Sequence, residues 1–170
     1  RHSKWRRLLV TDGYLCAVWE SEALGEPPNA GCYDLSDPSS PAPVGGDAPG
    51  IVPEAAADGL LFEGGGPANH EFAAADPERG AVWRHGYQRG ITSLAAVTDR
   101  TAYVMTAAER TLVAGEDRPA LPTFAVDRAS GDVRWSFVHA GTAWLGPGMA
   151  YLRDGDTVHA LDEAGGDVLG

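Results

Sequence analysis

A short motif recurs along the chain, and it constrains the fold more than any other feature of the sequence. Its clearest copy is TFAVDRASGDVRWSF, residues 123–137. Residues 123–126 form a short β run, and residues 133–138 form a second one. Between them, residues 127–131 make a turn in which Asp and Ser can bond the local backbone and Gly supplies a positive φ. The motif therefore predicts a β-hairpin with a tryptophan on its return strand.

Weaker copies of the motif align on the turn Asp and Gly, which are four residues apart, with an Ala two residues before the Asp. The three aligned sets are Ala74, Asp76 and Gly80; Ala125, Asp127 and Gly131; and Ala160, Asp162 and Gly166. A fainter copy has Cys32 in the Ala place and Asp34 in the Asp place. Successive turn Asp residues are 42, 51 and 35 positions apart, which is near the ~40 to 50 residues of one four-stranded propeller blade. Helical repeats have similar periods, but these segments lack helical apolar spacing.

The repeat predicts an all-β chain that folds as a partial β-propeller. We expect one domain over residues 1–170, with about four blades of antiparallel four-stranded sheet at approximately 1–50, 51–90, 91–140 and 141–170, not closed into a ring. The 22 glycines and 12 prolines fit a turn-rich chain, and a hydrophobic content of 44% argues against disorder. Because the chain begins at Arg1 and stops at Gly170, where a return strand should carry its Trp, we expect the remaining blades in flanking sequence.

The clearest copy also resembles a known repeat. Ala125-x-Asp127-x-x-Ser130-Gly131-x-x-x-Trp135 is similar to the A-x-D-x-x-T-G-x-x-x-W signature of PQQ-like β-propeller repeats, with Ser130 standing in for the Thr. This family includes quinoprotein alcohol dehydrogenases and BamB-type lipoprotein scaffolds. The resemblance implies that Trp135 packs flat against the neighbouring blade, that Ala125 leaves room for it, and that Asp127 and Ser130 close the turn.

The other copies depart from the family pattern at the tryptophan. Trp83 follows Gly80 by three residues instead of four, and Gly170 stands where the last copy should have its Trp. The shorter spacing leaves two interpretations open. Either that strand carries a one-residue slip, or Trp83 faces differently from Trp135.

The two cysteines, Cys16 and Cys32, lie on segments that we expect to be successive strands of the first blade. A disulfide between them is geometrically possible if the strands pair in the right register. The alternative is a pair of buried small hydrophobic residues. Two cysteines alone do not identify a redox compartment.

The sequence offers little catalytic chemistry. Its five histidines have no metal-ligand spacing, and no G-x-S-x-G nucleophile elbow is present. Asp154-Gly155-Asp156 is similar to the start of a calcium loop, but His159 stands where the turn Gly belongs and Gly165 where a bidentate Glu is needed. A tight hairpin turn explains the segment better. We therefore expect no metal, no organic cofactor and no catalytic residue.

The resemblance favours a non-catalytic scaffold that binds a protein or peptide outside the cytoplasm. One alternative is a fragment of a quinone-dependent dehydrogenase. Members of that kind use a vicinal Cys-Cys disulfide and residues from nearly all blades, whereas Cys16 and Cys32 are far apart in the sequence. A second alternative is the outer sensor domain of a membrane kinase.

Net charge, apolar runs and loop lengths indicate which kinds of partner the chain can bind and where. The net charge of −11 repels phosphate backbones, so the sequence argues against nucleic-acid binding. No run approaches the ~18 apolar residues of a membrane helix. The longest insertion inside a predicted blade, residues 107–120, and the glycine-rich turn at 64–69 are the candidate contact loops.

Overall fold

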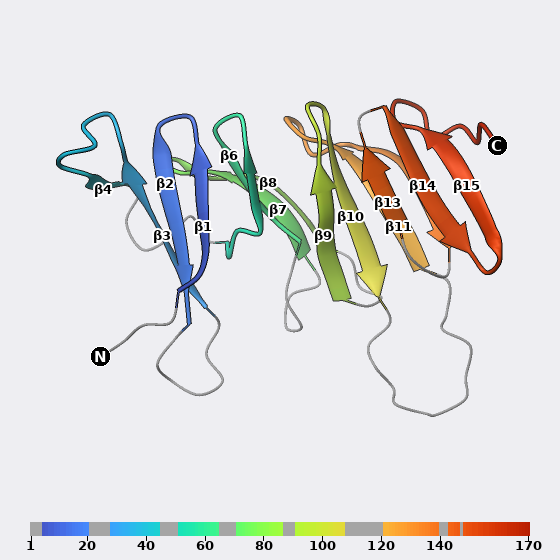
Figure 1. Ribbon diagram of the computed structural model, residues 1–170, viewed down its shortest axis with the longest axis horizontal. Coiled ribbons are helices and arrows are strands. Elements are labelled where there is room, and N and C mark those ends of the chain that lie inside the picture. Colours follow the sequence, from blue (N-terminus) through green and yellow to red (C-terminus); the bar gives the residue numbers. More distant parts are fainter. Residues whose placement is uncertain are drawn as a thin grey trace. The chain divides into compact units, whose positions relative to one another are not determined.

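The computed structural model describes residues 5–20, 28–44, 51–64, 71–86, 91–107, 121–139, 143–146 and 148–170. Within these ranges every regular element is a β-strand (Figure 1). The chain divides into two compact units. The first unit comprises Arg1–Glu63 and Ala73–Arg84, and the second comprises Gly64–Phe72 and His85–Gly170.

The described strands form four antiparallel sheets, and consecutive strands are neighbours in each sheet. The first sheet contains β1 (Trp5–Thr11), β2 (Tyr14–Trp19), β3 (Asn29–Asp34) and β4 (Ala42–Val44); the second contains β5 (Ala55–Ala57), β6 (Leu60–Glu63), β7 (Glu71–Asp76) and β8 (Gly80–Gly86). The third contains β9 (Ile91–Val97), β10 (Thr101–Ala107), β11 (Leu121–Asp127) and β12 (Val133–His139); the fourth contains β13 (Ala143–Gly146), β14 (Met149–Asp154) and β15 (Thr157–Asp162). No sheet closes on itself. The predicted all-β class, with four antiparallel meanders and no closed ring, is confirmed for the described part of the chain.

Tight turns join the first two strands of the first and second sheets. Asp12 and Gly13 have φ angles of 36° and 84°, and Asp58 and Gly59 have angles of 43° and 77°. Two successive positive φ values are typical of the two-residue turns whose twist matches that of a β-hairpin. The Asp-Gly dipeptides thus set the register of both hairpins.

Each sheet contains one row of cross-strand neighbours that includes the motif Ala position, and we call it the repeat row. In the third sheet the repeat row is Ala96, Tyr103, Ala125 and Trp135. The repeat rows of the other sheets are Leu9, Cys16, Cys32 and Val44 in the first; Ala55, Phe62 and Ala74 in the second; and Trp144, Tyr151 and Ala160 in the fourth. Because partners in a row point to the same side of a sheet, each repeat row marks one face.

In the first unit, the repeat row of the first sheet packs on the second sheet. Cys16 and Cys32 form one buried cluster with Ile51, Leu61, Ala73 and Ala75. Leu61 and Ala75 are cross-strand partners in a row that also contains Ala56, and we call this type of row the receiving row. It lies next to the repeat row along each strand and faces the opposite side of the sheet.

In the second unit, the same arrangement joins the third and fourth sheets. Tyr103, Ala125 and Trp135 of the repeat row are buried with Ala150, Leu152 and Leu161. Leu145, Ala150 and Leu161 are cross-strand partners and form the receiving row of the fourth sheet. Two interfaces, one in each unit, therefore follow one rule, in which a repeat row packs on a receiving row.

The second unit also includes ring contacts of Phe72. Its ring lies 5.4 Å from the ring of His85 and 6.0 Å from that of Phe124, and both pairs are stacked. The Nε2 atom of His85 donates a hydrogen bond to the carbonyl oxygen of Gly131. The turn glycine of the third sheet is thus fixed by a side chain from the end of β8.

Candidate functional site

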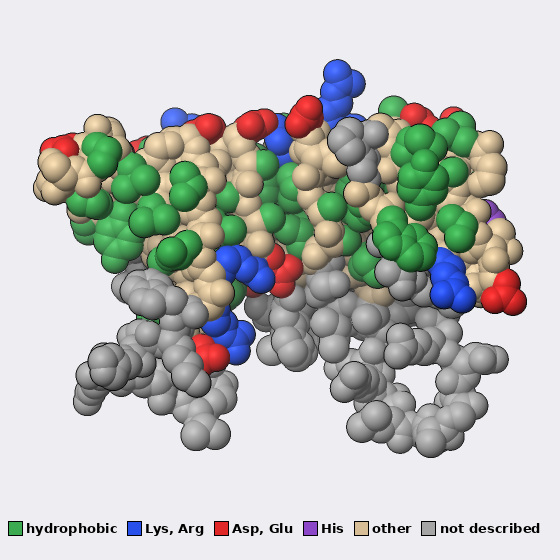
Figure 2. Space-filling view, in the orientation of Figure 1, with side chains coloured by type: hydrophobic (Ala, Val, Ile, Leu, Met, Phe, Trp, Pro, Cys, Tyr) green, Lys and Arg blue, Asp and Glu red, His purple; other side chains and the backbone are tan. Residues whose placement is uncertain are grey.

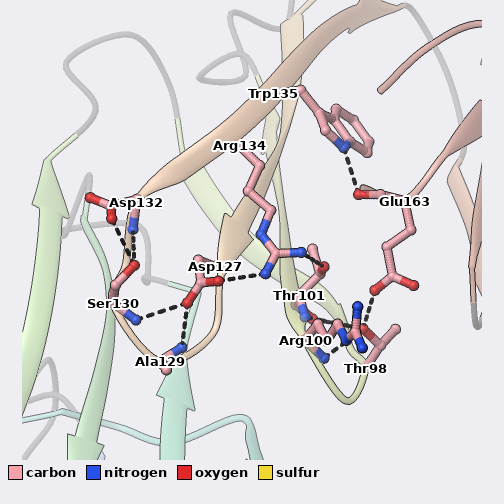
Figure 3. A network of polar contacts seen from close by, with 10 residues as sticks. All are labelled: Thr98, Arg100, Thr101, Asp127, Ala129, Ser130, Asp132, Arg134, Trp135 and Glu163. Atoms are coloured by element: carbon pink, nitrogen blue, oxygen red, sulfur yellow. Dashed lines mark hydrogen bonds and ion pairs between the residues drawn. The ribbon is translucent and has the colours of Figure 1, made fainter. Parts of the chain in front are cut away.

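The turns that follow the motif aspartates are held by the same type of bond in every copy. Asp127 Oδ1 accepts hydrogen bonds from the backbone N–H groups of Ala129 and Ser130, both at 3.0 Å (Figure 3). Equivalent bonds run to Asp34 Oδ1 from Ser36, to Asp76 Oδ1 from Glu78 and Arg79, and to Asp162 Oδ2 from Gly165. These short polar side chains satisfy backbone donors that the turn leaves without a strand partner.

A β-bulge in the third sheet explains the spacing of its tryptophan. Ala125 pairs with Trp135, but Val126 pairs with Val133, so Arg134 is the additional residue on β12. A bulge inserts one residue on one strand and leaves the partner strand unchanged. The four-residue step from Gly131 to Trp135 therefore includes this bulge.

The side chain of Arg134, the bulge residue, stabilises the Asp127 turn. The Arg134 guanidinium forms an ion pair with Asp127 and also donates to the hydroxyl of Thr101 at 3.4 Å. The amide of Ser130, together with the Arg134 guanidinium, lowers the pKa of Asp127 to about 2. Asp127 therefore stays ionised throughout the neutral range, and its charge serves to hold the turn.

Glu163 connects the two sheets of the second unit. Its backbone carbonyl accepts the indole Nε1–H of Trp135 at 2.9 Å. One carboxylate oxygen accepts the Thr98 hydroxyl and the other accepts the amide of Gly148 at 2.7 Å. The amide of Glu163 in turn donates to the Gly148 carbonyl at 3.1 Å. Glu163 thus joins β12, the β9–β10 turn and the β13–β14 turn. These two turns, Glu163 and the Asp127 turn form the set that we call the turn cluster, and Figure 3 shows its residues around Thr98, Asp127 and Glu163.

The protonation of Glu163 follows from these contacts. Burial alone would raise its pKa, but the hydrogen bonds from Thr98 and Gly148 act in the opposite direction and prevail, so the pKa lies below its ordinary value. A carboxylate held in this way is a poor general base because both of its oxygens already accept hydrogen bonds.

Tyr103 lies beneath this cluster and is fully buried. Its ring is 6.0 Å from that of Trp135, and among the described residues its hydroxyl has no hydrogen-bond partner. Burial, and then the nearby charge of Glu163, raise the pKa of Tyr103 well above its ordinary value. The phenol therefore stays neutral and acts as a packing group.

The other residues predicted from the motif fall at several places in the fold. Ala74 pairs with Phe62, whose ring lies 6.3 Å from that of Trp83, so Trp83 is on the same face as its repeat row and is buried. This pair matches Tyr103 and Trp135 in the third sheet. Ala160 is in the repeat row of the fourth sheet. Its amide donates a hydrogen bond at 2.8 Å to the carbonyl oxygen of Gly170, the residue at the position where the motif has its Trp.

Cys16 and Cys32 are directly opposite each other on β2 and β3 and form a disulfide. They stand at the repeat-row positions that Tyr103 and Ala125 take in the third sheet. The covalent bond therefore joins two strands at the place where the third sheet has the cross-strand pair of Tyr103 and Ala125.

The candidate contact loops cannot be placed. Residues 108–120 of the insertion and residues 65–69 of the glycine-rich turn lie outside the described residues. Within the described ranges, no group of three His, Cys, Asp or Glu side chains is arranged to hold a metal ion. The same part of the chain has no helix that is long and apolar enough to span a membrane.

Glu163 and Thr98 are the main residues that the motif did not indicate. Glu163 directly follows the turn aspartate Asp162, but its partners come from turns that are distant in the sequence. One indirect signal of Glu163 is present in the sequence. A Trp that the motif places in the core needs an acceptor for its indole N–H, and the Glu163 carbonyl is that acceptor.

Comparison with known proteins supports the fold. No family model matches the chain, and no curated protein matches it. Among solved structures, the chain is similar to the crystal structure of BamB from Moraxella catarrhalis, with 13% sequence identity and a TM-score of 0.54. The similarity covers 96% of this chain and 48% of that chain, so the chain spans about half the length of its structural neighbour. At this identity the likeness shows a β-propeller-like fold.

Proposed function

We propose that this chain is a non-catalytic β-propeller module whose turn cluster presents a fixed surface to a protein partner. One observation carries the proposal. The ionised groups of the cluster are held by hydrogen bonds and an ion pair. The exposed side chains around them include those of Asp99, Arg100, Ala129, Ser130 and Asp132. A rigid frame with exposed polar tips is suited to recognition, because little conformational entropy is lost on binding.

The likeness to BamB supports this proposal at the level of fold, and function must be argued from the site. The acids whose pKa values are shifted in the cluster are both lowered, and each is explained by turn hydrogen bonds. Catalytic acids and bases are usually tuned toward neutral pH. The protonation of these groups therefore favours a binding role, and an extracytoplasmic location remains part of the proposal through the family resemblance.

A photo-crosslinking residue at Ala129, which is exposed on the turn cluster, tests the proposal. We expect it to capture a discrete protein from an extract of the source cells, and the substitution Arg100→Glu should reduce the yield about tenfold, as for loss of a ~1.4 kcal/mol contact. The same residue at Val82, which is exposed on β8 in the first unit, is the matched control. Equal capture from both positions would reject the turn cluster as the contact surface.

Deletion of residues 108–119 separates the turn cluster from the insertion as the binding surface. If capture at Ala129 persists and thermal stability changes little, the turn cluster carries the contact, since loop length alone has a small effect on stability. Lost capture with unchanged stability would assign the contact to the insertion.

The dehydrogenase alternative has its own measurement. Pyrroloquinoline quinone and calcium are added to the chain, and the absorbance of the quinone is recorded. A spectral change that saturates at one quinone per chain would favour the enzyme and contradict the proposed binding role.

A further inference from the structure

The repeat row of the fourth sheet is exposed, although its counterparts in the first and third sheets are covered. Trp144 and Tyr151 are 52% and 40% exposed. In the third sheet the matching residues are Ala96 and Tyr103, and Tyr103 is fully buried against the next sheet. Figure 2 shows hydrophobic side chains over β13 and β14. The fourth sheet therefore has the composition of a packing face without a covering sheet among the described residues.

The first sheet has the complementary feature. Its receiving row is Val10, Leu15, Tyr33 and Pro43, which are cross-strand partners. Val10 is 66% exposed, and Leu8 on the same face is 62% exposed. The corresponding receiving rows of the second and fourth sheets, which contain Leu61 and Ala150, are buried beneath a repeat row. In the part of the chain that the structure describes, one repeat row and one receiving row thus have no sheet packed on them.

We propose that two copies of this chain associate head to tail, with the repeat row of the fourth sheet of one copy packed on the receiving row of the first sheet of the other. The contact continues the rule that both internal interfaces follow. Trp144 supplies the large aromatic side chain at this contact, in the sheet where the motif tryptophan is replaced by Gly170.

The chemistry of the two rows favours this occupant over a polar ligand. The side chains of both rows are aliphatic or aromatic, and burial of such surface is the main favourable term in association. Two faces that differ from each other give a heterologous contact, which closes into a ring or extends into a chain of copies. Because each copy has a net charge of −11, the contact has to form against repulsion, and physiological salt, with a screening length of about 8 Å, is the appropriate condition. This association is independent of the protein that the turn cluster binds.

Mass measurements on variants of the whole chain test the inference. In sedimentation velocity over a concentration series, the unaltered chain should form dimers or larger species. Trp144→Arg, which blocks the repeat row, and Val10→Arg, which blocks the receiving row, should each be monomeric. An equimolar mixture of these two variants should recover a 1:1 dimer, because each keeps the face that the other has lost.

The controls make each outcome decisive. Val82→Arg, at an exposed valine of the second sheet (48% exposed), should assemble like the unaltered chain. Circular dichroism verifies that each variant is folded, and Tyr151→Arg and Leu8→Arg replace any variant that is not. The inference is wrong if the unaltered chain stays monomeric, if the mixture stays monomeric, or if Val10→Arg still dimerises, which would indicate a symmetric contact between two fourth sheets.

Discussion

At the scale of single residues, Trp135 of the third sheet approaches the backbone of Gly166, in the turn after β15, very closely. Gly166 has a φ of 70°, and a Cβ atom built on it would lie 2.5 Å from Cγ of Trp135. Real Cβ atoms do not approach a ring carbon so closely. The indole therefore requires glycine at this turn for two reasons, the left-handed backbone and the absence of a side chain.

The substitution Gly166→Ala should destabilise the chain far more than Gly155→Ala. Gly155 also has a positive φ, but a Cβ there would meet no atom within 4 Å. We expect Gly155→Ala to cost about 1 kcal/mol for the left-handed conformation alone. Gly166→Ala should cost roughly 1 to 3 kcal/mol more because of overpacking against Trp135. Urea unfolding of the two variants measures the difference.

A double-mutant cycle attributes the difference to the ring. Trp135→Ala should itself cost about 3 to 5 kcal/mol, as for other large buried aromatics. In that background, Gly166→Ala should cost no more than Gly155→Ala does, because the clash is gone. An unchanged penalty in both backgrounds would show that Trp135 is not the neighbour that excludes a side chain.

At the scale of elements, the Asp127 turn should make the third sheet sensitive to acid. The folded-state pKa of Asp127 is about 2, below its ordinary value of 3.8. A lowered pKa stabilises the fold at pH values above the ordinary pKa, and this stabilisation is lost as the pH falls from about 4 to about 2. Asp127→Asn should therefore cost about 1 kcal/mol at neutral pH, a typical value for one hydrogen-bonded turn group, and almost nothing near pH 2.

The measurement is urea unfolding of the unaltered chain and of Asp127→Asn at a series of pH values. Asp156→Asn is the control, because the Asp156 side chain is fully exposed and its ion pair with Arg153 is long, at 3.9 Å. A stability difference for Asp127→Asn that is independent of pH would mean that shape, and not charge, holds the turn.

The strands and hairpins were predictable because their signals are local. Asp154-Gly155 forms the predicted turn between β14 and β15, and the Asp of each motif copy bonds its own turn. The bulge at Arg134 was not predictable. Trp83 follows its turn glycine by three residues and Trp135 by four, and this difference fitted either a one-residue slip of a strand or a Trp83 side chain on the other face of its sheet. Glu163 was also missed, because its role depends on which turns the packing of two sheets brings together.

At the scale of the whole molecule, the fold is a series of sheets in which the same pair of rows is used again. Repeat architectures of this kind derive their stability from each sheet and its nearest neighbours. The two compact units each contain one complete interface of a repeat row with a receiving row. Damage to one interface should therefore remain within its own unit.

Hydrogen exchange of the Trp135→Ala variant tests this locality. Amides of β14 and β15 should lose protection, because Ala150 and Leu161 on these strands pack in the same cluster as Trp135. Amides of β2 and β3 in the first unit should exchange as in the unaltered chain. Equal loss of protection in both units would show that the chain unfolds as a single cooperative domain.

The disulfide between Cys16 and Cys32 gives the first sheet a property that the other sheets lack. It joins β2 and β3 on either side of the connection between Trp19 and Asn29. If a protease cut the peptide backbone within that connection, the two resulting polypeptides would remain one covalent molecule. They would separate on a denaturing gel only after a reducing agent was added. A nick at this position would therefore leave the shorter N-terminal piece, with all of β1 and β2, attached to the rest of the protein.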